Sequence, residues 1–163
     1  MNTNTNTPAI IHTDIVDGDK IKISLSPKGF GSENKSMIRM LKPTEPVDKI
    51  KEFVIEVVKK AGADACPPLV LGIGIGGTFE KCALLAKRAL LRPIDERNPK
   101  KHIARLEREL LRDINSLGIG PMGLGGRTTV LGVNILDSHT HIAGMPVAVN
   151  VSCHATRSAE KII

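Results

Sequence analysis

The cysteines of this chain differ in their surroundings, and the difference bears on which of them could bind a metal ion. Cys66 comes before two prolines and an apolar run that ends in glycines, and Cys153 follows the apolar residues 145–151. Both are predicted to lie where a strand meets a loop, a position that suits a thiolate ligand of a metal and equally a core cysteine. Cys82 instead shares a predicted helix face with Ala86, where cysteine behaves as a small buried hydrophobe.

Two histidines form a second candidate group. His139 and His141 make a His-x-His pair just before residues 145–151. On an extended chain, residues i and i+2 point to the same side, so both imidazoles could bind one zinc ion. No acidic third ligand is evident nearby in the sequence, so ordinary hydrogen-bonding histidines are favoured over a zinc site.

Gly72, Gly74 and Gly77 match the glycine pattern of dinucleotide-binding folds, between a predicted strand and a predicted helix. That fingerprint also needs a second strand ending in an acidic residue about 20 positions later. Asp95 and Glu96 follow the helix directly, with no strand before them, so nicotinamide-nucleotide binding is not expected. Two interpretations remain: a tight strand-to-helix turn without a ligand, or an anion site at the helix N-terminus.

Composition narrows the class of protein. With 163 residues, 41% of them hydrophobic, the chain is long enough for one globular domain with its own core. No apolar run reaches the ~20 residues of a membrane span, and residues 1–8 do not resemble a secretion signal, so a cytoplasmic protein is expected. Residues 81–112 carry ten basic and four acidic side chains, but three phenylalanines are the only aromatic residues among Phe, Trp and Tyr. Stacking platforms for nucleic acid are therefore missing, and we interpret the basic stretch as a solvated helix surface.

The pattern of apolar residues predicts the elements that position these groups. Apolar positions three and four apart predict helices at residues 46–61, 78–91 and 101–117. Apolar runs predict strands at residues 69–75, 128–136 and 145–151. Asp-Gly between two β-rich runs predicts a hairpin of residues 8–16 and 20–26. The predicted fold is therefore mixed α/β, a β-sheet with antiparallel hairpin strands packed by about three helices. Residues 1–7 are expected to be a disordered tail and residues 8–163 a single lobe.

Several short motifs occur together in one order. They are Ser32-Glu33-Asn34, Cys66-Pro67-Pro68, residues 72–79, residues 117–126, and residues 146–150 ahead of Cys153. Together they resemble the α-subunit of the iron–sulfur hydro-lyases, class I fumarate hydratase and L-tartrate dehydratase. The resemblance covers residues 7–157, and several motifs in the right order are more specific than any single one.

The resemblance implies an enzyme that reversibly hydrates fumarate to malate or dehydrates tartrate. It implies a [4Fe–4S] cluster bound by three cysteines, whose remaining iron acts as a Lewis acid on substrate. By position, Cys66 and Cys153 match two of the cluster ligands, and His141 matches a catalytic histidine that contacts substrate. Gly29-Phe30-Gly31 matches a glycine loop that lines the substrate site, although Phe30 stands where the family usually has glycine.

The resemblance also implies missing parts. The family's first cluster cysteine belongs to a segment upstream of residue 1, so the third cysteine ligand is absent from this chain. The family's β-subunit or C-terminal domain supplies arginines and the proposed catalytic base. We therefore expect both regions as partners, a small dicarboxylate substrate, an oligomer in the complete enzyme, and no activity of this chain alone. We also expect Cys66 and Cys153 to be close and accessible and Cys82 to be buried. The alternative function is a non-catalytic binding or assembly domain with a glycine-rich anion-binding loop.

Overall fold

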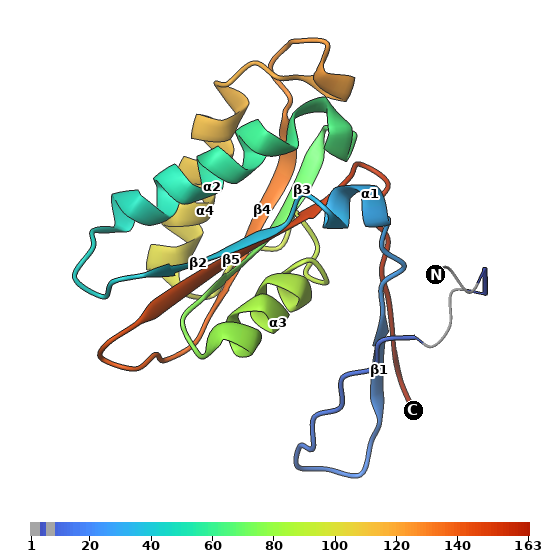
Figure 1. Ribbon diagram of the computed structural model, residues 1–163. Helices are drawn as coiled ribbons and strands as arrows, with labels where there is room; N and C mark the ends of the chain where they lie inside the picture. The colour runs from blue at the N-terminus through green and yellow to red at the C-terminus, as the bar shows by residue number, and fades with distance from the viewer. Residues whose placement is uncertain (1–3, 6–8) are drawn as a thin grey trace.

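The structure is a computed structural model that describes residues 4–5 and 9–163, and its body is a four-stranded mixed sheet with helices on both faces (Figure 1). The strand order is β2 (Met37–Leu41), β5 (Met145–Ser152), β3 (Leu69–Ile75) and β4 (Val130–Asp137). β3 and β4 run parallel, whereas β5 runs antiparallel to both of its neighbours. The mixed α/β class predicted from the sequence is therefore confirmed.

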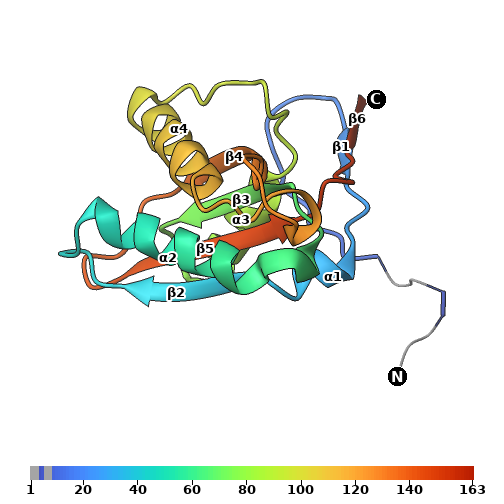
Figure 2. The same ribbon diagram turned by 90° about the horizontal axis from the view of Figure 1, so that it is seen from above.

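Helices α2 (Val47–Ala61) and α4 (Lys101–Asn115) cover one face of this sheet, and α3 (Phe79–Ala89) covers the other (Figure 2). All three helices were predicted, with ends that differ by at most two residues from the predicted ones. None of the helices among the described residues is long and apolar enough to cross a membrane.

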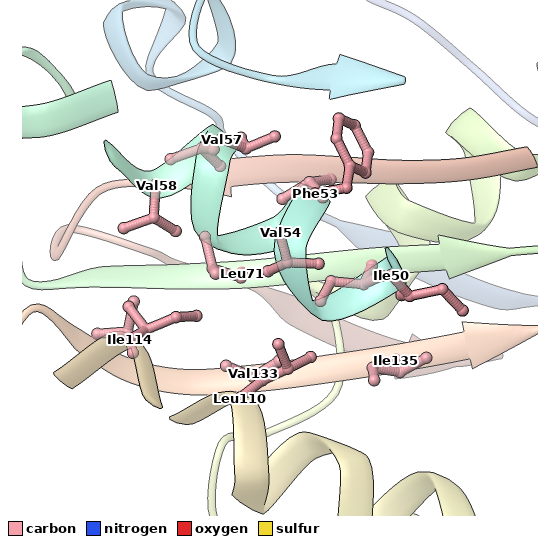
Figure 3. Close-up of a cluster of buried hydrophobic side chains, with 14 of the residues drawn as sticks. Ile50, Phe53, Val54, Val57, Val58, Leu71, Leu110, Ile114, Val133 and Ile135 are labelled. Carbon is pink, nitrogen blue, oxygen red and sulfur yellow. The ribbon is translucent and has the colours of Figure 1, made fainter. Parts of the chain in front are cut away.

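The main core lies between the sheet and the pair α2 and α4. Every second residue of β3, such as Leu71 and Ile73, points into it, because side chains alternate between the faces of a strand. Figure 3 shows the helix side chains, among them Phe53 and Leu110, meeting the strand side chains from the opposite side. The core is built from aliphatic residues and Phe53, as the low aromatic content of the chain requires.

The glycines of β3 have a packing role on the opposite face. A Cβ atom on Gly72 would lie 2.1 Å from the carbonyl oxygen of Ala86, and one on Gly74 would lie 2.1 Å from that of Cys82. Both acceptors belong to α3, so the helix backbone rests directly on the strand. This close approach explains two of the three glycines in the apparent dinucleotide fingerprint without any ligand.

The predicted N-terminal hairpin is wrong. Strand β1 (Lys22–Leu25) does form within residues 20–26, but it pairs with β6 (Ala159–Ile162) in a separate two-stranded ribbon. Residues 9–16 are exposed and form no strand, and Pro8 lies outside the described residues. The chain does bend at residues 17–19, where Gly18 has φ +124°, but a turn signal specifies only the bend and not the strand that follows it.

Four short elements form where the sequence predicted only a loop or no element. Helix α1 (Phe30–Glu33) is a single turn within the glycine loop at residues 28–36, and β2 follows it. Short 3₁₀ turns at Gly62–Ala65 and Pro121–Gly123 flank the region of Cys66. Most of the tail predicted to be disordered, residues 1–3, 6 and 7, lies outside the described residues.

Candidate metal centre

Cys66 and Cys153 lie at the same end of the sheet. β3 begins three residues after Cys66, β5 ends one residue before Cys153, and these two strands are antiparallel neighbours. The ring Nδ1 of His154 donates a hydrogen bond of 3.1 Å to the carbonyl oxygen of Cys66. The two cysteines that the sequence nominated are thus brought together from positions far apart in the chain. Cys66 is exposed and Cys153 is half-buried, so both are accessible.

The backbone presents Cys66 in an unusual conformation. Its φ is +55° and its ψ is +63°, the left-handed region that residues other than glycine seldom adopt. Such conformations persist only where the surroundings impose them, and they concentrate at functional sites. Here the Cys66 amide donates to the carbonyl oxygen of Ala63 at 3.0 Å, and the next residue accepts a bond of 2.9 Å from the amide of Met122.

The second glycine loop, residues 118–126, braces this segment. A Cβ atom on Gly123 would lie 2.5 Å from the Cβ of Ala63, so the loop packs closely on the turn that leads into Cys66. The amide of Leu69, at the start of β3, donates to the carbonyl oxygen of Thr129 just beyond the loop. The sequence identified the loop as a motif but gave it no role, and the structure gives it a supporting one.

The glycine loop at residues 28–36 meets the same end of the sheet. Lys28 donates through its Nζ to the carbonyl oxygen of Val151, two residues before Cys153. The same ammonium lies 3.1 Å from Glu33 and 3.3 Å from the hydroxyl of Ser32. Gly29, Phe30 and Gly31, nominated as the substrate loop, are exposed between these anchors. The structure therefore brings this loop together with the two cysteines.

Lys28 and Glu33 form an ion pair although both side chains are largely buried. Burial lowers the pKa of Lys28 more than the hydrogen bond and charge of Glu33 raise it. Burial by itself would raise the pKa of Glu33, but hydrogen bonds from Lys87 and Lys28 outweigh burial and lower it. Sequence reasoning missed Lys28 altogether, because a charged residue in an irregular loop belongs to no periodic pattern.

His141 lies at the other end of the sheet. It stands between the end of β4 and the start of β5, four residues before Met145, whereas Cys153 follows the end of β5. β5 has eight residues, a span of about 25 Å at roughly 3.3 Å per residue. His141 is exposed, and its Nδ1 accepts a hydrogen bond of 3.1 Å from the amide of Ala143. Within one copy of the chain, His141 and the cysteines therefore do not share a site.

A sequence model of the family described as fumarate hydratase (Fumerase) matches residues 1–161. The chain belongs to the fumarate hydratase family. It is 53% identical to the putative L(+)-tartrate dehydratase subunit alpha of Methanocaldococcus jannaschii over 144 residues, which are 88% of this chain and 50% of that protein. The L(+)-tartrate dehydratase alpha subunits of Escherichia coli and Shigella sonnei are each 35% identical over 162 residues, 99% of this chain and 54% of theirs. The chain thus spans about half the length of the curated relatives it matches.

In this member of the fumarate hydratase family, the turn after β3 offers little to an anion. The amide of Gly76 donates to the carbonyl oxygen of Pro146 at 2.9 Å, and the amide of Gly77 donates to that of His139 at 3.0 Å. The hydroxyl of Thr78 donates to the carboxylate of Glu80, which adds negative charge to the first turn of α3. Since an anion site needs free N–H donors, the geometry disfavours the anion-binding loop.

Cys82 is part of the core, as the sequence predicted. It is fully buried, and its Sγ donates a hydrogen bond of 3.2 Å to the carbonyl oxygen of Gly74. Burial raises the pKa of the Cys82 thiol to about 11. Within the described part of the chain, no three His, Cys, Asp or Glu side chains gather in a group that could bind a metal ion, so neither the histidine pair nor the two cysteines has a third ligand there.

Proposed function

We propose that this chain is the part of a hydro-lyase α-subunit that supplies Cys66 and Cys153 as two ligands of a [4Fe–4S] cluster. The complete enzyme would reversibly hydrate fumarate to malate or dehydrate tartrate. The observation that carries the proposal is the placement of both cysteines, accessible, at one end of the sheet, in a chain of the fumarate hydratase family.

The donor set suits this cofactor. Thiolates are the usual ligands of iron–sulfur clusters, and these two are accessible at a braced loop, whereas Cys82 is buried and protonated. We propose that an upstream segment of the α-subunit supplies the third cysteine ligand. When bound, the cluster would supply a Lewis-acidic iron for the hydroxyl and carboxylate of the substrate.

The residues of this chain would act around that iron. Gly29, Phe30 and Gly31 are proposed to line the dicarboxylate site, because they are exposed beside the two cysteines. The Phe30 side chain is 74% exposed, so it is free to border a substrate. Gly29 and Gly31 leave open space in which an added Cβ meets no atom within 4 Å, so the backbone there is approachable.

His141 is proposed as a catalytic residue that acts on the site of a second copy. Within one copy, the length of β5 separates it from Cys153. Its Nδ1 accepts from Ala143, so its Nε2 is the ring nitrogen left to contact a substrate. An oligomer is thereby required for activity, in addition to the upstream segment and the β-subunit.

The α-subunit of the complete enzyme is proposed to act together with a β-subunit. The relatives are named as alpha subunits, which supports a β-subunit partner for this chain as well. We propose that residues 8–163 act as one lobe of the α-subunit, and a cytoplasmic location stays a prediction. We propose that the choice between fumarate and tartrate falls partly to groups outside this chain.

The first experiment tests the cysteines. The chain is co-expressed with an upstream segment that carries the missing cysteine and with the β-subunit, and the cluster is reconstituted anaerobically. Cluster absorbance, fumarate hydration and tartrate dehydration are measured for Cys66→Ser and Cys153→Ser, with Cys82→Ala as the matched control. We expect the first two variants to lose the cluster and the control to retain it. A cluster that survives both serine substitutions would rule out the proposed ligands.

The second experiment tests where His141 acts. A Cys66→Ser copy and a His141→Ala copy, each inactive alone, are assembled together. If the site uses His141 of the other copy, we expect about a quarter of the wild-type activity, because half of randomly formed two-fold dimers are mixed and each has one intact site. If His141 serves its own copy, no mixed site is intact and activity stays at zero.

A further inference from the structure

Lys28 stands apart from the other lysines of the described chain by its burial. Only 13% of its side chain is exposed, whereas the other ion-paired lysines range from 23% to 60%. Its three partners come from two segments: Glu33 and Ser32 from α1, and the carbonyl oxygen of Val151 from β5. An ammonium group has three N–H donors, so these partners account for all of them.

Glu33 extends this contact into a network. Glu33 also accepts from Lys87 of α3. Both of its carboxylate oxygens accept from the side-chain nitrogen of Asn150, at 3.1 and 3.2 Å. Ser36 also joins the network, because its hydroxyl oxygen accepts from the side-chain amide of Asn150 and from the backbone amide of Val151. We refer to Lys28, Glu33, Ser36 and Asn150 as the loop clamp. It joins the glycine loop to the last residues of β5.

The orientation of Asn150 shows that the network is imposed at a cost. Its nitrogen donates to Glu33 and Ser36, and its buried side-chain oxygen has no hydrogen-bond partner among the described residues. A buried polar atom without a partner costs about 1–3 kcal/mol. The fold therefore gives up one acceptor of Asn150 in order to fix the position of Glu33.

We propose that Lys28 is a positioning residue for Cys153, one that fixes the end of β5 and the glycine loop against each other so that the cysteine faces Cys66. This inference rests on the proposed function, in which both cysteines are ligands. Val151, the acceptor of Lys28, is two residues from Cys153, so a shift of the clamp moves the thiol directly. Removal of residues that orient metal ligands typically lowers metal affinity about 10–100-fold.

The experiment uses the full chain and Cd²⁺ as a probe of paired thiolates. Cadmium–thiolate absorption is titrated for the wild type, Lys28→Met, Lys28→Arg and Glu33→Gln, and thermal unfolding is followed in parallel. We expect Lys28→Met and Glu33→Gln to bind Cd²⁺ at least about tenfold more weakly, and Lys28→Arg to recover part of the loss because it keeps the charge. The matched control is Lys49→Met, which removes a lysine from an exposed ion pair with Glu52 within α2, away from both cysteines.

The outcomes separate this inference from the proposed function. If Cys66→Ser and Cys153→Ser leave Cd²⁺ binding unchanged, the paired-thiolate site itself fails. If those variants lose binding but Lys28→Met and Glu33→Gln bind as the wild type does, the two cysteines remain and only the positioning role is overturned. Equal losses in Lys28→Met and Lys49→Met would also overturn it. If Lys28→Met does not fold, the comparison of Glu33→Gln with Lys28→Arg decides.

Discussion

The glycines of β3 give the sharpest test of how this sheet is assembled, and Gly74→Ala is the substitution to make. The new methyl group would lie 2.1 Å from the carbonyl oxygen of Cys82 and 2.9 Å from the amide nitrogen of Ala86. Ordinary contacts begin at 3.4 Å, so the helix would have to move by about 1.3 Å. Both obstructing atoms are backbone, so no side-chain rotation can make room.

The cost follows from this displacement. Over-packing a well-packed core costs about 1–3 kcal/mol, and a clash with helix backbone on a central strand belongs at the upper end. The hydrogen bond from Cys82 to the carbonyl oxygen of Gly74 would lengthen as well. We therefore expect a loss of about 3 kcal/mol in the free energy of unfolding. For a domain of this size the midpoint of thermal unfolding should fall by about 6–12 °C.

The assay is thermal and urea unfolding followed by circular dichroism, with Gly144→Ala as the matched control. A Cβ on Gly144 would meet only the methyl carbon of Met40, at 4.0 Å, so that variant should unfold within about 1 °C of the wild type. A Gly74→Ala protein with the stability of its control would refute the packing role of the glycine. A variant with unchanged stability that lost binding of an anionic ligand would restore the anion-loop interpretation.

Three further outcomes are expected. Cys82 should react with a thiol reagent at least about 100-fold more slowly than Cys66 in native protein, because a pKa raised from 9.0 to about 11 reduces the thiolate fraction and burial blocks access. Glu107→Ala should lower the free energy of unfolding by about 3–5 kcal/mol in urea titrations, because it leaves the largely buried Arg92 without its carboxylate. Since the folded-state pKa of Glu33 is lowered, its stabilising contribution is present above pH 4.5 and is lost as the pH falls through the folded value. Glu33→Gln should therefore flatten the acid side of the pH–stability profile.

A specific result would contradict each of these outcomes. Glu52 forms an exposed ion pair with Lys49, so Glu52→Ala should cost only about 0–1 kcal/mol, and an equal loss in Glu107→Ala would contradict the buried network. Rapid labelling of Cys82 in folded protein would contradict its core position. An acid profile that is the same in the wild type and Glu33→Gln would show that Glu33 titrates normally.

The sequence predicted the elements whose physical signal is local. α2 and α4 repeat apolar residues every three or four positions over fifteen residues each, and that period depends on nothing outside the helix. β3, β4 and β5 are apolar runs long enough to be buried on both faces. In both cases the residues that make the pattern are the ones that fill the core.

The elements that were missed have no such signal. β1 and β6 are exposed along their full length and pair across more than 130 positions, so neither strand indicates its partner. α1 is one turn long, shorter than the period that would identify it. β2 is an edge strand that is mostly half-buried, and its five residues follow no strict alternation. The Asp-Gly turn signal therefore predicted a local hairpin, because nothing in the sequence indicates that β1 pairs with the distant β6.

Part of the candidate site could also be predicted from the sequence, and part could not. Cys66 and Cys153 could be nominated because each stands at a strand end, and antiparallel strands bring such ends together. The separation of His141 from them could not be predicted, because the order of motifs along a chain does not fix which end of a sheet each one occupies. Lys28 escaped notice because its partners, Glu33 and the backbone of β5, are joined only by the tertiary fold.

The position of the two cysteines depends on the strands more than on their own loops. Side chains on a strand alternate with a period of two, so a slip of β3 by one residue against β5 would turn every core side chain of β3 toward α3. Gly72 and Gly74 prevent this slip, since only glycine fits where the backbone of α3 touches the strand. A fixed register of β3 against β5 also fixes the start of β3, and therefore the position of Cys66 beside the end of β5. Gly72 and Gly74, which match part of the dinucleotide-binding pattern, are thus expected to affect the position of Cys66 and Cys153 through the register of the sheet. Gly74→Ala should accordingly weaken Cd²⁺ binding at Cys66 and Cys153 even under conditions in which the variant remains folded.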